Sequence, residues 1–374
     1  MSRPTTITIH LNALQHNLQH IKTLAPHSKI IAMVKSNAYG HGIQRIASAL
    51  SNADALGVAC IEEGMILRNA SIRKPIVLME GLFTEDELIS AANNHLTIIV
   101  HHIDQVHMLE KNEQLTPLSI WLKVDTGMHR LGFTPAEVQT IYRRLQACSS
   151  VKKPIGFMTH FAKADSLDSP MTQQQIDLFN NACAHLEGPK SLANSAGIIA
   201  WPHAHEDWVR PGIMLYGASP FTGHTGEQYG LKPVMSFSSR LIAIHHISSG
   251  DSVGYGGHWI APEDMLIGIV GAGYGDGYPR HAKNGTPVLV NGIKCQLVGR
   301  VAMDMLAVDL RDIPFAKVGD PVLLWGPHLP VEEIAHCSGT IGYELLTRIT
   351  QRVYVSIQDT FENRTPVTDS EIIN

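Results

Sequence analysis

Short apolar runs alternate with helix-length amphipathic segments over roughly the first 230 residues of the chain. Each run is brief and rich in β-branched side chains, as is typical of strands buried on both faces of a parallel sheet. The intervening segments, such as 135–146 and 172–185, space their apolar residues as a helix does. Eight strands are expected, at Ile31–Val34, Leu56–Ala59, Ile76–Met79, Thr97–Val100, Ile120–Val124, Ile155–Thr159, Leu192–Asn194 and near Trp208–Tyr216. This alternation predicts an α/β fold in which residues 1–231 form a (β/α)8 barrel of the TIM type.

After Lys232 the pattern changes to short alternating β-type runs that are separated by glycine-containing turns. Asn284-Gly285 and Asn291-Gly292 are predicted to be hairpin turns, because these dipeptides favour the left-handed conformation that such turns need. We therefore expect residues 232–374 to form a second, mainly β C-terminal domain.

The composition is that of an ordinary globular protein, with 44% apolar and 17% charged residues among 374. The net charge is −5 and the basic residues are dispersed, which argues against nucleic-acid or anionic-membrane partners and favours a small-molecule partner. The N-terminal residues lack the long apolar stretch of a secretion signal, and no later run has the ~18 apolar residues of a membrane span. A cytoplasmic location is expected.

The cysteines and histidines do not form a metal-binding pattern. Five cysteines lie far apart, which favours reduced thiols over a disulfide framework. The 21 histidines include adjacent pairs, but neither an H-E-x-x-H helix nor a C-x-x-C pair accompanies them. No metal is expected.

Chemically active side chains follow several of the predicted strands. Lys35 comes directly after Ile30–Val34, at the strand end where barrel enzymes hold their active sites. A lysine at this place either extends its stem to solvent or acts as a Schiff-base nucleophile. Further polar residues follow other strands and should share the same face of the barrel: Lys123, Asp125, His160, Asn194, Ser195 and Arg210.

Two segments carry a resemblance to a known family. Residues 34–42, Val-Lys-Ser-Asn-Ala-Tyr-Gly-His-Gly, resemble the pyridoxal-phosphate lysine motif V-K-x-N-A-Y-G-H-G of the alanine racemase family at every specified position. Residues 122–132 resemble a second signature of that family, and further matches extend the resemblance over nearly the whole chain. Ala302 and Tyr354 are modest departures, since many members have cysteine and proline there.

The resemblance implies pyridoxal 5'-phosphate as the cofactor and assigns residues to it. Lys35 would bind the cofactor aldehyde, and Arg210, with His160 beside it, would face the pyridine nitrogen. A permanently charged guanidinium there should keep that nitrogen unprotonated and weaken the ring as an electron sink. The implied cofactor-binding set is Lys35, Tyr39, Arg130, His160, Asn194, Ser195, Arg210, Gly212, Ile213 and Tyr343.

The resemblance also implies a two-base mechanism, since racemisation removes the α-proton from one face and returns it on the other. Lys35 would act on the D-face and Tyr255 on the L-face. Family members receive this tyrosine from the other subunit, which implies a homodimer with shared active sites. Arg130 and the backbone N–H of Met303 would bind the substrate carboxylate, with Lys123 either carbamylated or in an ordinary ion pair. The implied substrate entrance comprises Asp165, Tyr274, Arg280 and Arg300.

The expected function is therefore alanine racemisation, which supplies D-alanine for peptidoglycan synthesis. A broad-specificity amino-acid racemase on the same scaffold is the alternative. A single-barrel pyridoxal-phosphate carrier would lack the second domain with Tyr255. A decarboxylase is less favoured, because Arg130 and Met303 would hold the carboxylate that such an enzyme releases.

Overall fold

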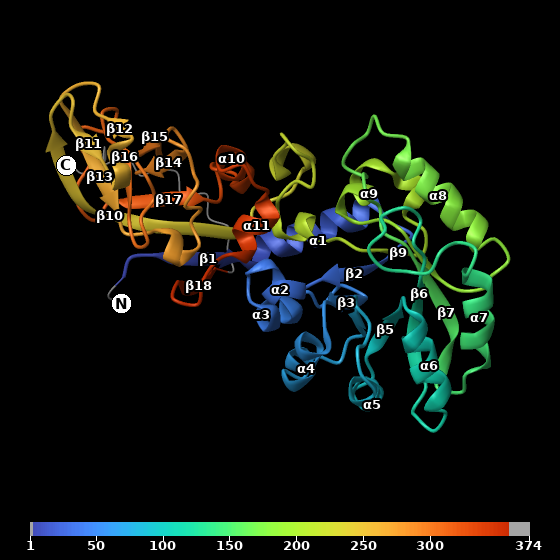
Figure 1. The fold of residues 1–374 in the computed structure, drawn as a ribbon. Helices are drawn as coiled ribbons and strands as arrows, with labels where there is room; N and C mark the ends of the chain where they lie inside the picture. Colours follow the sequence, from blue (N-terminus) through green and yellow to red (C-terminus); the bar gives the residue numbers. More distant parts are fainter. Residues whose placement is uncertain (1–2, 359–374) are drawn as a thin grey trace, which may run out of the picture. The chain divides into compact units, whose positions relative to one another are not determined.

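The computed structural model describes residues 3–358, which fold as two compact units (Figure 1). The barrel unit comprises Asn17–Leu215 and Pro220–Thr222. The β unit comprises the residues before Asn17, Tyr216–Ser219 and the residues from Gly223 onward. Among the residues described, no helix is both long and apolar enough to cross a membrane.

The barrel unit is built on eight parallel strands in the order β8-β7-β6-β5-β4-β3-β2-β9. Residues around β8 and β9 hydrogen-bond to each other at the two ends of this order: the Arg210 N–H donates to the Ala193 carbonyl at 2.9 Å, and the Ser191 hydroxyl donates to the Trp208 carbonyl at 2.8 Å. The predicted TIM-type barrel is thereby confirmed as a nearly closed one. Its strands are β2 (Lys29–Met33), β3 (Ala55–Val58), β4 (Ile76–Leu78), β5 (Thr97–Val100), β6 (Leu118–Lys123), β7 (Val151–Met158), β8 (Lys190–Ser191) and β9 (Trp208–Val209).

Two of the predicted strands differ from the observed ones. The seventh ends at Ser191, so Leu192–Asn194 is the turn that follows it rather than the strand itself. The eighth covers only Trp208–Val209, and Ile213–Tyr216 form a short 3-10 helix, η2. Pro211 explains the early end of β9, because a proline has no N–H to donate to a strand ladder.

Helices connect the barrel strands. The predicted helices at 135–146 and 172–185 correspond to α7 and α8, each displaced by a few residues at its ends. Inside the barrel, close packing depends on glycine: a Cβ on Gly156 would lie 2.4 Å from the Trp121 ring. The helices are α1 (Leu11–Leu24), α2 (Lys35–Tyr39), α3 (Ile43–Ala49), α4 (Ile61–Asn69), α5 (Glu85–Asn93), α6 (Ile103–Lys111), α7 (Val138–Ala147), α8 (Met171–Ala182), α9 (Ser195–Ala200) and η1 (Pro202–Ala204).

The β unit confirms the predicted mainly β C-terminal fold. Its sheet has the order β13-β16-β15-β14-β17-β10-β1-β18, and β13 also pairs with β10. The strands are antiparallel except for the β1–β18 pair, in which Thr6 lies opposite Tyr354. The main strands are β1 (Thr6–His10), β10 (Met235–Ile247), β13 (Met265–Val270), β14 (Pro287–Val290), β15 (Ile293–Val298), β16 (Leu306–Asp309), β17 (Pro321–Trp325) and β18 (Tyr354–Gln358).

Shorter elements complete the β unit. A two-stranded ribbon pairs β11 with β12, and two helices and three 3-10 turns lie between the strands. Their bounds are β11 (Ser252–Val253), β12 (Trp259–Ile260), α10 (Val331–Cys337), α11 (Gly342–Thr347), η3 (Gly226–Tyr229), η4 (Tyr255–Gly257) and η5 (Tyr274–Asp276).

Only one of the two predicted hairpin turns joins neighbouring strands. Asn291 and Gly292, at φ 51° and 78°, connect β14 to β15 as a two-residue hairpin. Asn284-Gly285 instead lies in a turn that leads into β14, where the Gly285 N–H donates to the Leu297 carbonyl at 2.9 Å. The second hairpin prediction is therefore wrong. Glycine at φ 88° suits this turn as well as a hairpin, so the dipeptide alone does not distinguish the two.

Candidate active site

Lys35 begins a left-handed turn at the carboxyl end of β2. Ser36, Asn37, Ala38 and Tyr39 have φ angles of 52–54°, although each carries a side chain. Such a conformation costs about 1–2 kcal/mol per residue and persists only where surrounding contacts impose it. The turn therefore fixes the direction in which the Lys35 side chain leaves the strand.

Hydrogen bonds from neighbouring residues hold this turn. The Glu63 carboxylate of α4 accepts the Ser36 N–H at 2.6 Å and the Ala59 N–H at 2.8 Å. The Asn37 side-chain oxygen accepts the Ile43 N–H at 2.9 Å. Buried His41 donates from Nδ1 to the carbonyl of Tyr39 at 2.8 Å, and burial lowers its pKa to about 4. His41 is therefore a neutral structural side chain with its proton on Nδ1. Sequence reasoning placed no function on Glu63.

Two hydroxyl groups converge on Gly212. A Cβ on Gly212 would lie 2.5 Å from the Tyr39 hydroxyl oxygen, so only glycine leaves room for that phenol. The Gly212 N–H donates to the Ser195 hydroxyl oxygen at 2.9 Å. Burial raises the pKa of Tyr39 to about 12, which keeps its hydroxyl protonated. The Tyr39 and Ser195 hydroxyls thus both lie beside the backbone of Gly212.

Asn194 holds the start of the helix α9, which carries Ser195. Its side-chain oxygen accepts the Gly197 N–H at 2.9 Å and so caps the first turn of α9. The structure therefore places its oxygen on the helix that carries Ser195. Ile213 follows Gly212 and is fully buried at the start of η2.

A substitution tests the close approach at Gly212. Gly212→Ala should destabilise the fold by about 1–3 kcal/mol, because the added methyl group overpacks against the Tyr39 hydroxyl. Removal of that hydroxyl in Tyr39→Phe should relieve part of this cost. A double-mutant cycle of unfolding free energies measures the coupling. If the two effects simply add, the steric contact at Gly212 does not exist.

Arg210 lies buried at the carboxyl end of β9, with 2% of its surface exposed. Its guanidinium donates to the Ser191 hydroxyl and the Thr159 carbonyl, each at 2.6 Å, and to the Leu192 carbonyl at 3.0 Å. Burial lowers its pKa to about 9, so it stays charged at neutral pH. Among the described residues its buried Nε has no hydrogen-bond partner. This N–H is therefore available to a ligand.

His160 lies next to Arg210, and one Arg210 amino group donates to its Nδ1 at 3.4 Å. Burial first, and then the charge of Arg210, lower the pKa of His160 well below its ordinary value. The ring is therefore neutral, and its Nδ1 accepts while its Nε2 carries the proton. The predicted pairing of these two residues is present in the structure.

Lys123 is the last residue of β6 and is buried. Burial first, and then Arg210 and Arg130, lower its pKa to about 7. Lys123, Arg130 and His160 line one small pocket, and Arg130 is exposed to solvent. The carboxyl ends of β6, β7 and β9 thus bring three of the predicted residues together beside Arg210.

The β unit holds the remaining predicted residues except Asp165, which is exposed on the barrel unit. Tyr255 begins η4 and is 72% exposed. The preceding Gly254 packs against Arg300, since a Cβ on Gly254 would lie 3.2 Å from the backbone nitrogen of Arg300. The Tyr274 N–H donates to the Ala302 carbonyl at 3.0 Å, which binds the Tyr274 turn to the residues beside Met303.

Arg280 and Tyr343 are the other two predicted residues of the β unit. Arg280 is exposed, and Tyr343 lies half-buried in α11. Within the described residues, no group of three or more His, Cys, Asp or Glu side chains could hold a metal ion.

The barrel fold places an amine on a strained turn, a charged guanidinium with an open N–H, and a pair of converging hydroxyls at its strand ends. These features define a (β/α)8-barrel enzyme with a lysine-centred site. Residues 9–220 match the family model described as alanine racemase, N-terminal domain, and residues 234–357 match that of the C-terminal domain. The chain belongs to the alanine racemase family.

Individual relatives agree with this membership over the full length. The chain is 53% identical to the alanine racemase of Coxiella burnetii strain RSA 493 over 357 residues, covering 93% of this chain and 97% of the relative. It is 49% identical to the biosynthetic alanine racemase of an Escherichia coli O6:H1 strain, covering 95% and 99%. The crystal structure of the biosynthetic alanine racemase of Pseudomonas aeruginosa matches with a TM-score of 0.91 at 44% identity, covering 95% of this chain and 99% of the other.

Proposed function

We propose that this protein interconverts L-alanine and D-alanine with pyridoxal 5'-phosphate held on Lys35. Family membership over both units supports the reaction, since the relatives that it resembles are named alanine racemases. The observation that carries the cofactor assignment is Arg210, a buried and charged side chain with one N–H left open beside the strand ends. A broad-specificity racemase is not favoured.

The residues of the barrel unit fit this cofactor. Its aldehyde suits the Lys35 amine, and its phosphate suits the Tyr39 and Ser195 hydroxyls with the backbone around Gly212. The open Arg210 N–H suits a ring nitrogen that accepts a hydrogen bond, and Arg130 suits the phenolate. A structure of the Bartonella henselae alanine racemase, with a TM-score of 0.86 and 28% identity over 95% of this chain and 99% of that one, is described with covalently bound pyridoxal phosphate. When bound, the cofactor delocalises the charge that deprotonation of the substrate α-carbon leaves behind.

The chain's own residues bind the substrate and move its proton. Arg130 and the Met303 N–H hold the substrate carboxylate, which fixes the α-carbon between two faces. Lys35 Nζ removes or returns the proton on the D-face, and the Tyr255 hydroxyl does so on the L-face. Arg210 stays charged and therefore gives no proton to the ring nitrogen. Proton exchange is thereby confined to the α-carbon of the substrate. Tyr343 adds a hydroxyl for the phosphate, and Asp165, Tyr274, Arg280 and Arg300 line the entrance.

A homodimer with shared sites completes this proposal. Three large side chains of the β unit that include proposed site residues are exposed: Met303 is 52%, Met305 44% and Tyr255 72% exposed. If a partner covers them as one contiguous apolar surface, that surface is of the kind that protein interfaces bury. In the dimer Tyr255 serves the site of the partner subunit. The enzyme works in the cytoplasm and supplies D-alanine for peptidoglycan synthesis, a role supported by the relatives named biosynthetic.

A chirally resolved time course of L-alanine with purified, cofactor-loaded protein tests the function. L-Serine and L-lysine run beside it under the same conditions. Convergence on equal amounts of L- and D-alanine, with little turnover of the other two, is expected. The absence of D-alanine would overturn the proposal, and comparable racemisation of all three would replace it with the broad-specificity alternative.

Lys123 should form a carbamate with dissolved carbon dioxide. With a pKa of about 7, much of its amine is unprotonated at pH 8. Nζ can then attack the carbon of CO2, which forms an N–C bond, opens one C=O bond to a carboxylate and releases one proton from the nitrogen. The carbamate is an anion beside Arg130 and Arg210, and the positive charges of these two residues stabilise it. Protonation of the amine below pH 7 should reverse the reaction.

Carbon-13 NMR in labelled bicarbonate measures this carbamate. A carbamate resonance is expected in the wild type at pH 8, weaker at pH 6 and absent from Lys123→Met. A wild type without this resonance at pH 8, or Lys123→Met that retains it, would leave Lys123 as an unmodified buried amine.

A further inference from the structure

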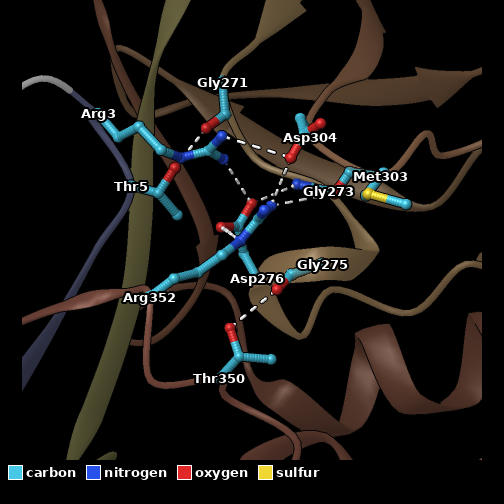
Figure 2. Close-up of polar contacts among 10 residues, drawn as sticks. All are labelled: Arg3, Thr5, Gly271, Gly273, Gly275, Asp276, Met303, Asp304, Thr350 and Arg352. Atoms are coloured by element: carbon cyan, nitrogen blue, oxygen red, sulfur yellow. Dashed lines mark hydrogen bonds and ion pairs between the residues drawn. The ribbon is translucent and has the colours of Figure 1, made fainter.

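An ion-pair network holds together distant parts of the β unit (Figure 2). The Asp276 carboxylate is fully buried and accepts Arg3 Nη2 and Arg352 Nε, each at 2.8 Å. It also accepts the Gly273 N–H at 2.9 Å. Arg352 extends to Asp304, with Nη2 2.7 Å from its carboxylate, and Arg3 reaches the same carboxylate at 3.4 Å. The network therefore contains two positive and two negative side chains, and its net charge is zero.

This network holds both peptide groups beside Met303. The Ala302 carbonyl, which shares a peptide group with the Met303 N–H, accepts the Tyr274 N–H at 3.0 Å. The Met303 carbonyl accepts the Gly275 N–H at 2.8 Å and Arg352 Nη2 at 3.3 Å. A trans peptide directs its N–H opposite to its carbonyl, so a fixed Ala302 carbonyl fixes the direction of the Met303 N–H.

The Tyr274 turn in contact with Met303 is itself held by the network. Asp276 closes this turn through the Gly273 N–H, and the Thr350 hydroxyl donates to the Gly275 carbonyl at 2.8 Å. A Cβ on Gly273 would lie 2.3 Å from the Ala302 carbonyl oxygen, and one on Gly275 would lie 2.7 Å from Arg352 Nη2. The Tyr274 turn and the segment Ala302–Met303 are therefore packed so closely that neither can shift relative to the other.

Stability alone is a weak reason for such a network. The cost of removing charges from water offsets much of the attraction within a buried ion pair. What a guanidinium adds is direction, because its N–H groups lie in one rigid plane. Arg352 uses this plane to join Asp276, Asp304 and the Met303 carbonyl, and Met303 itself remains 52% exposed.

We propose that Arg352, acting through Asp276 and Asp304, is a positioning residue that aims the Met303 N–H at the substrate carboxylate. It touches no reacting atom. This inference rests on the proposed function, in which Met303 binds that carboxylate. The network keeps the Met303 N–H and Tyr274 in one fixed relation, so the enzyme binds a small amino acid without rearranging this part of its pocket.

The test compares Arg352→Lys with a matched control in the dimeric, cofactor-loaded enzyme. Lysine keeps the charge and loses the planar fork. Arg311→Lys is the control, because Arg311 also binds two carboxylates, those of Asp309 and Glu263, away from the Met303 turn. Arg352→Lys should raise KM for alanine about 10- to 100-fold, the loss expected for one charge-assisted hydrogen bond, with a smaller change in kcat. Propionate, which is alanine without its amino group, should bind more weakly by a similar factor.

Two further measurements separate positioning from folding. Amides of residues 273–276 should exchange hydrogen faster in Arg352→Lys and unchanged in Arg311→Lys. If Arg352→Lys fails to fold, Asp304→Asn decides, since Asp304 is partly exposed and its replacement keeps the buried Asp276 pairs. It should raise KM and weaken propionate binding without a large change in kcat.

The outcomes separate this inference from the proposed function. Values of KM and propionate affinity within about twofold of wild type in the folded variant would overturn the positioning role. Equal changes in Arg311→Lys would do the same. A wild-type enzyme that does not racemise alanine would overturn the proposed function, and the inference would fall with it.

Discussion

Lys35→Ala should abolish alanine racemisation in both directions and prevent covalent retention of pyridoxal phosphate. In the proposed mechanism Lys35 is both the amine that binds the aldehyde and the base of the D-face, so no remaining group should replace it. A loss of more than about 10³-fold is expected, since general acid–base catalysis by one group contributes up to about 10⁴-fold. Chirally resolved time courses measure the racemisation rate. Mass spectrometry after borohydride reduction measures the covalent retention of pyridoxal phosphate.

Lys29→Ala is the matched control for this substitution. Lys29 is the first residue of β2 and Lys35 lies two residues beyond its last, so the two lysines lie at opposite ends of one strand. Lys29 is exposed and lies over the Trp208 ring, 5.4 Å from its centre. Its replacement should leave racemisation and cofactor retention unchanged. Cofactor that remains covalently bound in Lys35→Ala would assign the Schiff base to another lysine.

Tyr255→Phe should affect the two enantiomers unequally. In the proposed mechanism the Tyr255 hydroxyl is the base of the L-face, so without it α-proton exchange from L-alanine should fall by about 10²- to 10⁴-fold. Exchange from D-alanine, for which the proposal makes Lys35 the base, should fall far less. Proton NMR of each enantiomer in deuterated buffer measures both rates. Because Tyr255 is largely exposed, the substitution should leave the fold intact.

Tyr354→Phe is the control in this case, since Tyr354 is an exposed tyrosine of β18 in the same unit. Its exchange rates should match the wild type for both enantiomers. An equal loss of exchange from L- and D-alanine in Tyr255→Phe would contradict the two-base assignment. It would point instead to a general effect on substrate binding.

The barrel could be predicted because its strands are buried on both faces and therefore appear as continuous apolar runs. The site residues of the barrel unit could be grouped for a related reason: parallel strands all present their carboxyl ends at one face. Lys35, Lys123, His160 and Arg210 illustrate this, since each is the last residue of a strand or follows one closely.

Other features leave no local signal. Ser36–Tyr39 adopt left-handed conformations without a glycine among them, so residue preferences predict an ordinary turn. Asn194 caps α9, a role that asparagine often has before a helix, whereas the family resemblance assigns this residue to the cofactor. Arg3, Asp276 and Arg352 lie far apart in sequence, and only the folded β unit shows that they share one network.

The position of β1 has a consequence for synthesis on the ribosome. β1 pairs with β10 and with β18, the last strand described, whereas the barrel unit is nearly continuous from Asn17 to Leu215. Domains generally fold as units while the chain is made. The barrel can therefore fold while β1, which is made before it, still lacks its partners β10 and β18. During that time the exposed edges of β1 are open to wrong pairing, so aggregation of nascent chains should depend on β1 more than on any barrel strand.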